Sequence, residues 1–520
     1  MEFDVAIIGC GPVGALAANL LGRRGIHTLV VEQSASPHPL PRAVHIDHEM
    51  VRLFQDVDLT ETILPLMRDT DGHLHVGADG GVIRYMGTAG QARPFGWSND
   101  YFFYQPDLEG ALRAGLSRFD HVQLRLGCRL TGLVQAGGQA VLTLLDGEGE
   151  SHVAVRHVIA CDGASSPVRK LLGVRLDDLE FDEPWLVVDA EVDGPLSFPP
   201  VTGLPAQADL QRLSVMMCDP SRPATIVPGP RNLRRWEFML LPGEDDGEMM
   251  RSDIVADLLE PWVRDVPHRI VRAATYRFHG LVAERWRVGN VFLAGDAAHQ
   301  TPPFFGQGMC HGFRDVANLA WKLDMVLKGR APDALLDSYQ PEREPHVRSI
   351  IGAAVAAGRY ICVLDRDKAA ERDRTIRAQI AGGPPRTAAD LIPAIADGIV
   401  RPGAGQRFIQ PRVTLAGGTP HLLDDLTGGG WRLILQDNVA IPPLPAAPGI
   451  TAWSLGPQGI SDIDGALAGW FDRHGAVAIL LRPDFYIYGI AATADELPAL
   501  LSHLARDLGL KDKEGVTWAA

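Results

Sequence analysis

Three closely spaced glycines near the start of the chain could bind a phosphate group. Gly9, Gly11 and Gly14 stand between a β-prone apolar run and an Ala/Leu-rich stretch that predicts a helix. In such a loop the first glycine permits the turn, the second lets the backbone approach a pyrophosphate, and the third lets the helix pack on the strand. The amino terminus of the helix adds free N–H groups and a partial positive charge. The spacing therefore predicts a dinucleotide site.

A carboxylate completes this unit. The apolar run at residues 27–31 predicts a second strand, and it ends at Glu32, which can accept hydrogen bonds from a ribose diol. An ordinary turn without a ligand is the alternative interpretation. The motif alone does not distinguish FAD from NAD.

Two later turns also place an aspartate where a strand ends. Asp162-Gly163 follows an apolar strand, and Gly295-Asp296 is followed by a Pro-Pro-x-x-Gly-x-Gly turn that leads into a long amphipathic helix. An aspartate there can bind a sugar hydroxyl, and a glycine-rich turn before a helix points N–H groups at a ligand. Taken singly, each segment could also be a strand–turn–helix with an exposed aspartate.

The three segments GCGPVG, CDGASSPVR and GDAAHQTPPFFGQG, in this order and spacing, resemble the class A FAD-dependent aromatic hydroxylases, which are flavoprotein monooxygenases. The resemblance is closest to the 3-(3-hydroxyphenyl)propionate hydroxylase group. It covers about residues 1–395 and is looser towards the carboxyl terminus, where it depends on segments such as LLRPDFYIYGI.

The resemblance implies roles for individual residues. The glycines of the first turn would hold the FAD pyrophosphate, Glu32 its adenosine ribose, and Asp296 its ribityl chain. Pro302 would lie near the reacting edge of the flavin. NADH and NADPH are not distinguished, because the nicotinamide cofactor has no Rossmann unit of its own here. The remaining residues expected to contact FAD or the nicotinamide cofactor are Arg42, Gln105, Asp162, Gly163, Arg169, Gly306, Gly308 and Met309.

The resemblance also implies a reaction. NAD(P)H reduces FAD, the reduced flavin adds O2 to give a C4a-hydroperoxide, and this species hydroxylates a phenolic acid such as 3-(3-hydroxyphenyl)propionate. A base near the phenol helps, because the phenolate ring is more reactive. Two alternatives stay open: another aromatic substrate (a pyridine, quinone or polyketide), or an NAD(P)H oxidase without oxygen transfer.

Two residues are candidates for the phenol end of the pocket. Asp47 matches an aspartate of related phenol hydroxylases, but it also precedes a helical pattern and could be a helix N-cap. Tyr276 matches a pocket tyrosine, or is a packed sheet residue. His45 and His48 have the spacing of a metal pair, but no third ligand is apparent, so no metal site is expected. Four arginines could pair with a substrate carboxylate, and none is preferred: Arg93, Arg222, Arg234 and Arg235.

The expected fold is α/β, with a Rossmann-like FAD-binding domain interleaved with a β-sheet substrate domain. Short β-prone runs separated by turns predict the sheet. The resemblance implies a thioredoxin-like domain at the carboxyl terminus, and because this region lacks cysteine we expect a structural role, with a homodimer as one possible assembly. The expected divisions are residues 1–180 and 285–395 for the FAD-binding domain, 181–284 for the substrate domain and 412–520 for the last domain, after a Pro/Gly-rich linker.

Charge and cysteine content exclude several classes of protein. The 520 residues carry a net charge of −15, and an acidic chain repels phosphate backbones, so nucleic acid is not an expected partner. The six cysteines include no Cys-x-x-Cys pair, which argues against a disulfide scaffold or a zinc ribbon. No secretory or membrane-spanning segment is recognisable. We therefore expect a cytoplasmic enzyme whose partners are a small aromatic substrate and O2.

Overall fold

A six-stranded sheet organises the amino-terminal part of the chain. In this computed structural model, which describes residues 3–380, 391–415 and 417–510, its order is β18-β19-β12-β1-β2-β8. All neighbouring strands are parallel except the β18–β19 pair at one edge. The bounds are β1 (Val5–Ile8), β2 (Thr28–Glu32), β8 (Val122–Leu126), β12 (His157–Ala160), β18 (Arg287–Val288) and β19 (Val291–Leu293).

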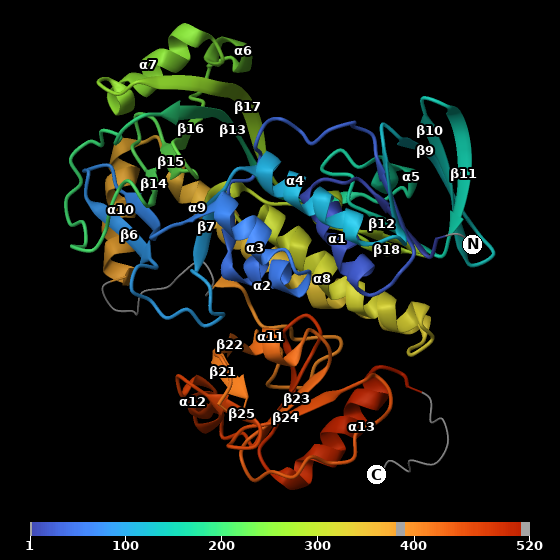
Figure 1. Cartoon of the computed structure of the whole chain (residues 1–520). Coiled ribbons are helices and arrows are strands. Elements are labelled where there is room, and N and C mark those ends of the chain that lie inside the picture. The colour runs from blue at the N-terminus through green and yellow to red at the C-terminus, as the bar shows by residue number, and fades with distance from the viewer. Residues whose placement is uncertain (1–2, 381–390, 416, 511–520) are drawn as a thin grey trace.

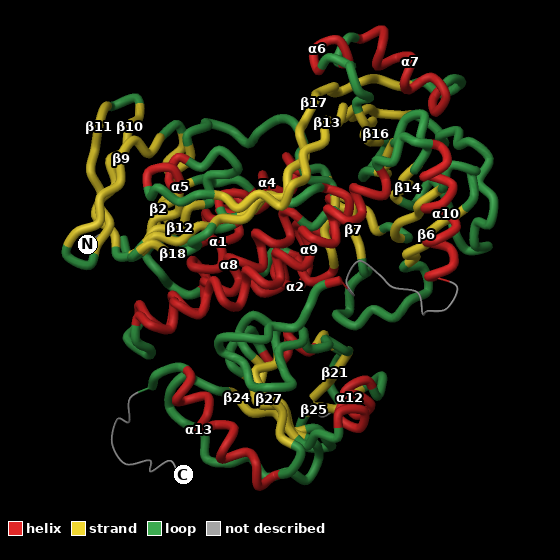
Figure 2. Tube along the Cα trace, turned by 180° about the vertical axis from the view of Figure 1, so that it is seen from behind, coloured by secondary structure: helices red, strands yellow, loops and turns green. Residues whose placement is uncertain are grey.

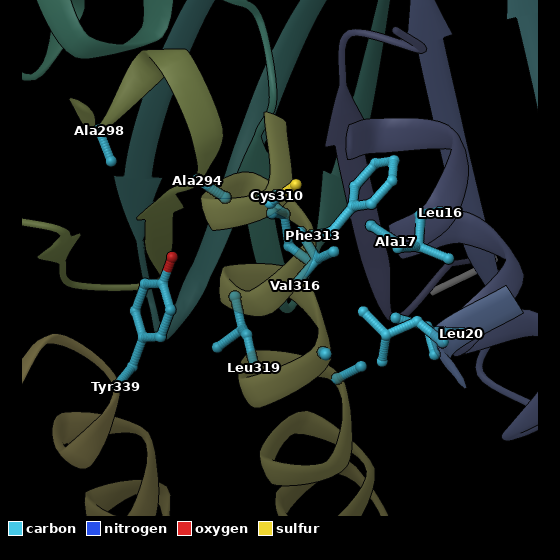
Figure 3. Packing of buried hydrophobic residues seen from close by; sticks show 14 of the residues in the cluster. Leu16, Ala17, Leu20, Ala294, Ala298, Cys310, Phe313, Val316, Leu319 and Tyr339 are labelled. Carbon is cyan, nitrogen blue, oxygen red and sulfur yellow. The ribbon is translucent and has the colours of Figure 1, made fainter. Parts of the chain in front are cut away.

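Two helices pack together beside this sheet and form the centre of the core. Helix α1 (Pro12–Arg23) follows the glycine turn, and α8 (Gly308–Leu327) follows the Pro-Pro-x-x-Gly-x-Gly turn. Leu16 and Leu20 of α1 lie opposite Phe313 of α8 (Figure 3), and all three are fully or almost fully buried. Further helices around this core are α4 (Gln105–Ala114), α5 (Pro167–Leu171) and α9 (Tyr339–Ile361).

An eight-stranded sheet of order β20-β17-β13-β16-β15-β14-β5-β6 forms the second layer (Figure 1). One face packs on α6 (Asp246–Met249) and α7 (Ser252–Val263) through Trp236, Phe238 and other apolar side chains. The strands are β5 (Gly72–Val76), β6 (Val82–Gly87), β13 (Leu176–Val192), β14 (Ser214–Met217), β15 (Ala224–Pro228), β16 (Leu233–Met239), β17 (His268–Ala283) and β20 (His299–Gln300).

The order of this sheet shows that the amino-terminal part of the chain contributes two of its strands, which the strand pattern did not predict. Strands β5 and β6 precede residue 180, yet they form one edge of the sheet, because β5 pairs in parallel with β14. The sheet expected from residues 181–284 thus also draws on the amino-terminal part of the chain. Smaller elements complete this part: β3 (His45–Asp47), α2 (His48–Asp56), α3 (Thr60–Ile63), β4 (Met67–Asp69), β7 (Asp100–Phe103), β9 (Arg129–Ala136), β10 (Gln139–Asp146), β11 (Gly149–Val155) and α10 (Arg366–Ile380).

The carboxyl-terminal part is a separate α/β unit, seen at the bottom of Figures 1 and 2. Its four-stranded sheet has the order β24-β23-β26-β27, in which β23 and β24 are parallel and β26 is antiparallel to both of its neighbours. The expected linker begins as α10 and continues through residues 381–390, which lie outside the described residues. The bounds of this unit are β21 (Arg412–Leu415), β22 (His421–Leu422), α11 (Leu423–Thr427), β23 (Arg432–Leu435), β24 (Thr451–Ser454), β25 (Ile460–Asp462), α12 (Ala466–His474), β26 (Ala478–Leu481), β27 (Ile487–Ala491) and α13 (Leu497–Asp507).

Buried ion pairs join this unit to the rest of the molecule. Glu342 of α9 accepts from Lys322 of α8 at 2.8 Å and from Arg482, which follows β26, at 2.6 Å. Arg52 of α2 pairs with Asp424 of α11, and both are buried. Charges taken out of water require partners of this kind. In the part of the chain that the structure describes, no helix has the length and apolarity needed to cross a membrane.

Candidate active site

A cavity of about 460 Å³ lies between the six-stranded and the eight-stranded sheet. Its walls come from the carboxyl ends of β1, β2 and β12, from the turn before α8, and from one face of the eight-stranded sheet. Ligands of open α/β sheets bind at this end of the strands. Eleven residues expected to contact the cofactors line it: Gly9, Gly11, Glu32, Arg42, Gln105, Asp162, Gly163, Asp296, Gly306, Gly308 and Met309.

The first glycine turn fits a pyrophosphate. Gly9 has a φ of +94°, and a Cβ on Gly14 would stand 2.0 Å from the Gly9 carbonyl oxygen, so both positions need glycine for the close approach of helix and strand. At Gly11, by contrast, a Cβ would meet no described atom within 4 Å and would occupy the cavity. Gly11 is also the N-cap of α1, and no side chain caps that helix. The N–H groups at its end are therefore available to an anion.

The polar residues around this turn hold each other in place. Glu32 accepts from the Cys10 N–H at 2.7 Å and from the Ser34 N–H at 2.8 Å, so its carboxylate both orders the turn and faces the cavity. Gln105 Oε1 accepts from the N–H groups of Arg42 and Ala43, both at 2.9 Å. Gln105 thus fixes the loop that carries Arg42.

The other two turns are also tied together. Asp162 accepts from the Ser166 hydroxyl at 2.6 Å and from the Val168 N–H at 2.9 Å. Arg169 donates to the carbonyl of Ala297 at 3.0 Å and does not line the cavity, so it joins the Asp162 turn to the Asp296 turn. Burial raises the pKa of Asp296, whose carboxyl faces the cavity.

A histidine and an aspartate form a hydrogen-bonded pair at the cavity wall, beside the glycine turn that precedes α8. His45 Nε2 lies 2.9 Å from Asp100 Oδ1, and both side chains are nearly inaccessible. A carboxylate only accepts, so Nε2 carries a proton in this pair, and Nδ1, 3.4 Å from the Gly306 carbonyl, is the nitrogen that gains or loses the second proton. Burial by itself lowers the pKa of His45, but the hydrogen bond and charge of Asp100 outweigh it, so the pKa is raised. His45 is therefore a strengthened base facing the cavity.

His73 of β5 stands next to this pair. Its ring centroid lies 5.3 Å from that of His45, it is 4% exposed, and neither ring nitrogen has a partner among the described residues. Burial lowers its pKa to about 4, so its ring is neutral. The ligand atoms of His45, His73 and Asp100 lie within 4.8 Å of one another, a spacing that would also suit a metal ion. Because Nε2 of His45 and Asp100 already satisfy each other, we interpret them as a hydrogen-bonded pair.

Alternation along the strands gives the eight-stranded sheet its second, cavity-facing side. On β16, Arg235 and Glu237 line the cavity, whereas Trp236 between them packs towards α7. Glu237 lies opposite Thr225 of β15 in the register. The further lining residues from this sheet are Ser214, Met216 and Val227.

None of the three residues expected to be catalytic lines the cavity. Asp47 caps α2 by accepting from the Glu49 N–H at 3.0 Å, and it pairs with Arg314 at 2.5 Å. Burial alone would raise its pKa, but Arg314 holds it far below the ordinary value. Asp47 therefore has the surroundings of a helix cap, and its expected role beside a phenol stays a prediction. The Tyr276 hydroxyl contacts Arg272 rather than the cavity, and Pro302 is buried between the lining residues Thr301 and Pro303.

Sequence reasoning missed the polar residues of the substrate wall. The sequence patterns draw attention to His45 only through its spacing from His48. They do not indicate a role for His73, Asp100, Thr225 or Glu237. One signal was present: Glu237 is a charged residue inside a run of large apolar side chains, Trp-Glu-Phe-Met. A carboxyl in such a strand costs free energy unless it has a purpose at a cavity.

The fold and this cavity define a flavoprotein in which a dinucleotide-binding sheet and a substrate sheet enclose one site. The FAD binding domain family matches residues 2–354, and the HcaD C-terminal domain family matches residues 448–507. The chain is 36% identical to a probable NADH-specific resorcinol 4-hydroxylase of Rhodococcus jostii, over 96% of this chain and 94% of that protein. It is 34% identical to a 3-(3-hydroxyphenyl)propionate/3-hydroxycinnamic acid hydroxylase of Burkholderia vietnamiensis, over 93% of each. The chain therefore belongs to the FAD-dependent aromatic hydroxylases, enzymes that use FAD and a nicotinamide cofactor.

Solved structures agree with this fold. The flavin-dependent monooxygenase PieE, in complex with FAD and substrate, superposes with a TM-score of 0.79 at 21% identity and covers 98% of this chain and 99% of its own. Aklavinone-11 hydroxylase, with FAD and aklavinone, has a TM-score of 0.76 at 23% identity and covers 98% of this chain and 99% of its own. At these identities the likeness concerns the fold alone.

Proposed function

We propose that the chain hydroxylates the ring of a phenol, with His45 as the base that takes the phenol proton. The observation that supports this is the buried His45–Asp100 pair at 2.9 Å on the cavity wall. FAD bound there would supply the redox chemistry: with a hydride from the nicotinamide cofactor and with O2, one oxygen atom would be added to the ring and the other would leave as water. The cofactor residues named above are proposed to hold it between the two sheets.

Each protein group then has a physical task. His45 Nδ1 accepts the phenol proton, Asp100 keeps the ring oriented and stabilises its charge, and the Gly306 carbonyl can accept a hydrogen bond from the new Nδ1–H. Asp100 is in this sense a positioning residue. The walls from the eight-stranded sheet exclude water, which keeps activated oxygen from being lost as H2O2.

The experiment is a panel of phenols assayed together for NAD(P)H consumption, H2O2 release and product mass. Hydroxylation adds one oxygen atom to the product, whereas an oxidase releases H2O2 alone. His45→Gln is expected to lower hydroxylation by about 10²–10⁴-fold at neutral pH, with recovery as the pH nears that of phenol ionisation. Flavin content serves as the control, and a chelator is expected to change nothing. Unchanged coupling in His45→Gln would refute the role of His45.

The domain organisation is part of the same proposal. We assign residues 1–180 and 285–395 to FAD binding, although β5 and β6 of this range belong to the substrate sheet. We assign residues 412–520 to a thioredoxin-like domain. Support for the last comes from the strand order β24-β23-β26-β27, with β26 antiparallel to its neighbours and α13 after β27. A phenolic acid is the substrate that the resemblance implies. The homodimer stays a prediction.

A further inference from the structure

A carboxyl group stands on the substrate wall of the cavity. Glu237 is 8% exposed, lines the cavity from β16, and is surrounded by buried side chains of β13, β15 and β17. Burial raises its pKa to about 7, although Arg235 opposes the shift. An acidic group is retained in such a place at a cost in free energy, which indicates a ligand that offsets that cost.

An unpaired hydroxyl lies across from it. Thr225 of β15 is the register partner of Glu237, is 3% exposed, and also lines the cavity. Its Oγ1 has no hydrogen-bond partner within the described parts of the chain. Buried polar atoms are almost always paired, so a ligand group is the natural partner of this hydroxyl. Together Glu237 and Thr225 form a pair of adjacent polar groups on the wall that the eight-stranded sheet supplies.

The nearby arginine is already occupied. Arg235 makes two bonds to Asp189, at 2.7 and 3.0 Å, and donates to the carbonyls of Pro41 and Arg42 at 2.8 and 2.7 Å. Its guanidinium lies 4.0 Å from Glu237. It is therefore not free to bind a substrate carboxylate in a bidentate manner.

The charges of this cluster are already balanced. Arg235 and Arg272 supply two positive charges, and Asp189 and Glu237 supply two negative ones once the pH is above the Glu237 pKa of about 7. A substrate carboxylate would add a third negative charge in a place that excludes water. Of the other arginines that line the cavity, Arg113 pairs with Glu109 and Arg129 follows the Cys128 that bonds to Glu32, both on the cofactor side. Arg42 lies on the loop held by Gln105, and Arg235 donates to its carbonyl, so Arg42 stands between the cofactor turn and this cluster.

We propose that Glu237 and Thr225 bind a second hydroxyl group of a neutral substrate, so that the enzyme prefers a dihydroxybenzene to a phenol with a carboxylate side chain. This inference rests on the proposed function and narrows its substrate class. The ionised Glu237 accepts a hydrogen bond from the second hydroxyl, and Thr225 donates to its oxygen. A phenolic carboxylate places a second negative charge beside the ionised Glu237, whose nearest cation, Arg235, is already bound to Asp189, and is therefore disfavoured.

Three probes test this with the FAD-loaded enzyme: resorcinol, 3-methoxyphenol and 3-(3-hydroxyphenyl)propionate. 3-Methoxyphenol keeps the reacting phenol and replaces the second hydroxyl by a group that cannot donate. The expected kcat/KM for resorcinol is at least about 10-fold above that of either other probe, because a site built for a hydroxyl rejects an analogue without it. Binding is followed separately through the flavin absorbance change in the absence of NAD(P)H.

Two variants and one control separate specificity from stability. Glu237→Gln and Thr225→Val are each expected to lower kcat/KM for resorcinol at least about 10-fold and to leave 3-methoxyphenol within about 3-fold. Glu191→Gln removes a carboxylate of the same sheet that pairs with Arg269 on the surface, and it is expected to change none of the three. Thr225→Val keeps the test decisive if Glu237→Gln folds poorly.

The experiment distinguishes a failure of this inference from a failure of the proposed function. If the arylpropionate is the best substrate, or if both variants slow all phenols alike, the inference is overturned while hydroxylation stands. If no probe gains an oxygen atom in the wild-type enzyme, the proposed function fails and the inference fails with it.

Discussion

Asp47 illustrates how neighbours decide what a carboxylate can do. In sequence it precedes a helix and follows the loop that carries Arg42, which suits either a base or a cap. In the structure its two oxygens are taken by the Glu49 N–H and by Arg314, and its side chain is 1% exposed. A carboxylate that is already paired and shielded from the cavity stabilises the fold rather than moving a proton.

The variant Asp47→Asn tests whether Asp47 stabilises the fold as a helix cap and ion-pair partner rather than acting as a base. The amide can still cap α2, but the charged bond to Arg314 is lost, and a hydrogen bond to a charged group contributes about 1.5–3 kcal/mol. We expect a lower melting temperature and an unchanged ratio of product to NAD(P)H consumed. Asp58→Asn, at an exposed pair with Arg23, is the matched control and should change neither quantity noticeably. Loss of coupling at an unchanged melting temperature would return Asp47 to the base role.

Glu237 predicts a pH dependence of substrate choice. Its pKa is raised to about 7, so the negative charge that repels a substrate carboxylate appears as the pH rises through that value. The ratio of kcat/KM for resorcinol to that for 3-(3-hydroxyphenyl)propionate is expected to increase between pH 6 and pH 8. Taking the ratio cancels the ionisation of the phenol and of His45, which both substrates share. In Glu237→Gln the ratio should stay flat, and a slope kept in that variant would contradict the assignment.

Among the elements of the site, the turn before α8 leaves the space that the His45 imidazole occupies. Gly306 has a φ of +61°, and a Cβ there would lie 2.6 Å from His45 Nδ1. The turn needs glycine for two separate reasons: the left-handed backbone and the space taken by the imidazole. The same turn begins the helix that carries Arg314 and Lys322, so the site and the core share one element.

Gly306→Ala separates these two reasons when compared with Gly329→Ala. Gly329 has a φ of +66°, but its Cβ would meet no described atom within 4 Å, so it suffers only the backbone strain, about 1 kcal/mol. Gly306→Ala suffers that strain and also displaces His45. We expect similar flavin content in the two variants but increased H2O2 per NAD(P)H in Gly306→Ala only. Equal coupling in both would show that His45 does not need its present position.

At the scale of the whole molecule, α8 and α9 connect the cavity region to the carboxyl-terminal unit. Glu342 of α9 accepts from Lys322, from Arg482 and from the Asn318 side chain, and its second oxygen accepts from the Ile399 N–H at 2.7 Å. Burial alone would raise the pKa of Glu342, but Arg482 and Lys322 lower it to about 2. This carboxylate joins three regions of the chain.

Glu342→Gln is expected to destabilise the protein by about 3–5 kcal/mol at pH 7, because it leaves buried cations with too few partners. A carboxylate whose folded pKa is depressed adds stability above its ordinary pKa, near 4.5, and loses it as the pH falls towards 2. The variant should therefore show a smaller loss of stability over that range than the wild type. Denaturant unfolding at several pH values measures both effects. Glu344→Gln, on the more exposed side of α9, should cost at most about 1 kcal/mol, and an equal cost in both variants would contradict this role of Glu342.

The expected cofactor residues could be found from short segments of the sequence. The glycine turn, Glu32 and the two later strand-end aspartates are local signals, since each depends on a strand, a turn and a helix that are adjacent along the chain. For the same reason the β-prone runs predicted most strands of the substrate sheet. The contributions of β5 and β6 could not be read locally, because this hairpin joins the sheet through the pairing of β5 with β14, which spans more than a hundred residues.

The polar residues of the substrate wall, by contrast, are brought together by the folding of the chain. His45 and Asp100 are 55 residues apart and meet because β3 pairs with β7. Glu237 and Thr225 share a wall because the register of β15 and β16 puts them opposite each other, on the side of the sheet that faces the cavity. The short turn at residues 229–232 and the alternation of Glu237 with Trp236 and Phe238 set this register, but only the packing of the sheet over the cavity shows what the two side chains face. The chemistry of the cofactor is thus encoded in short segments, whereas the choice of substrate depends on how distant strands are aligned.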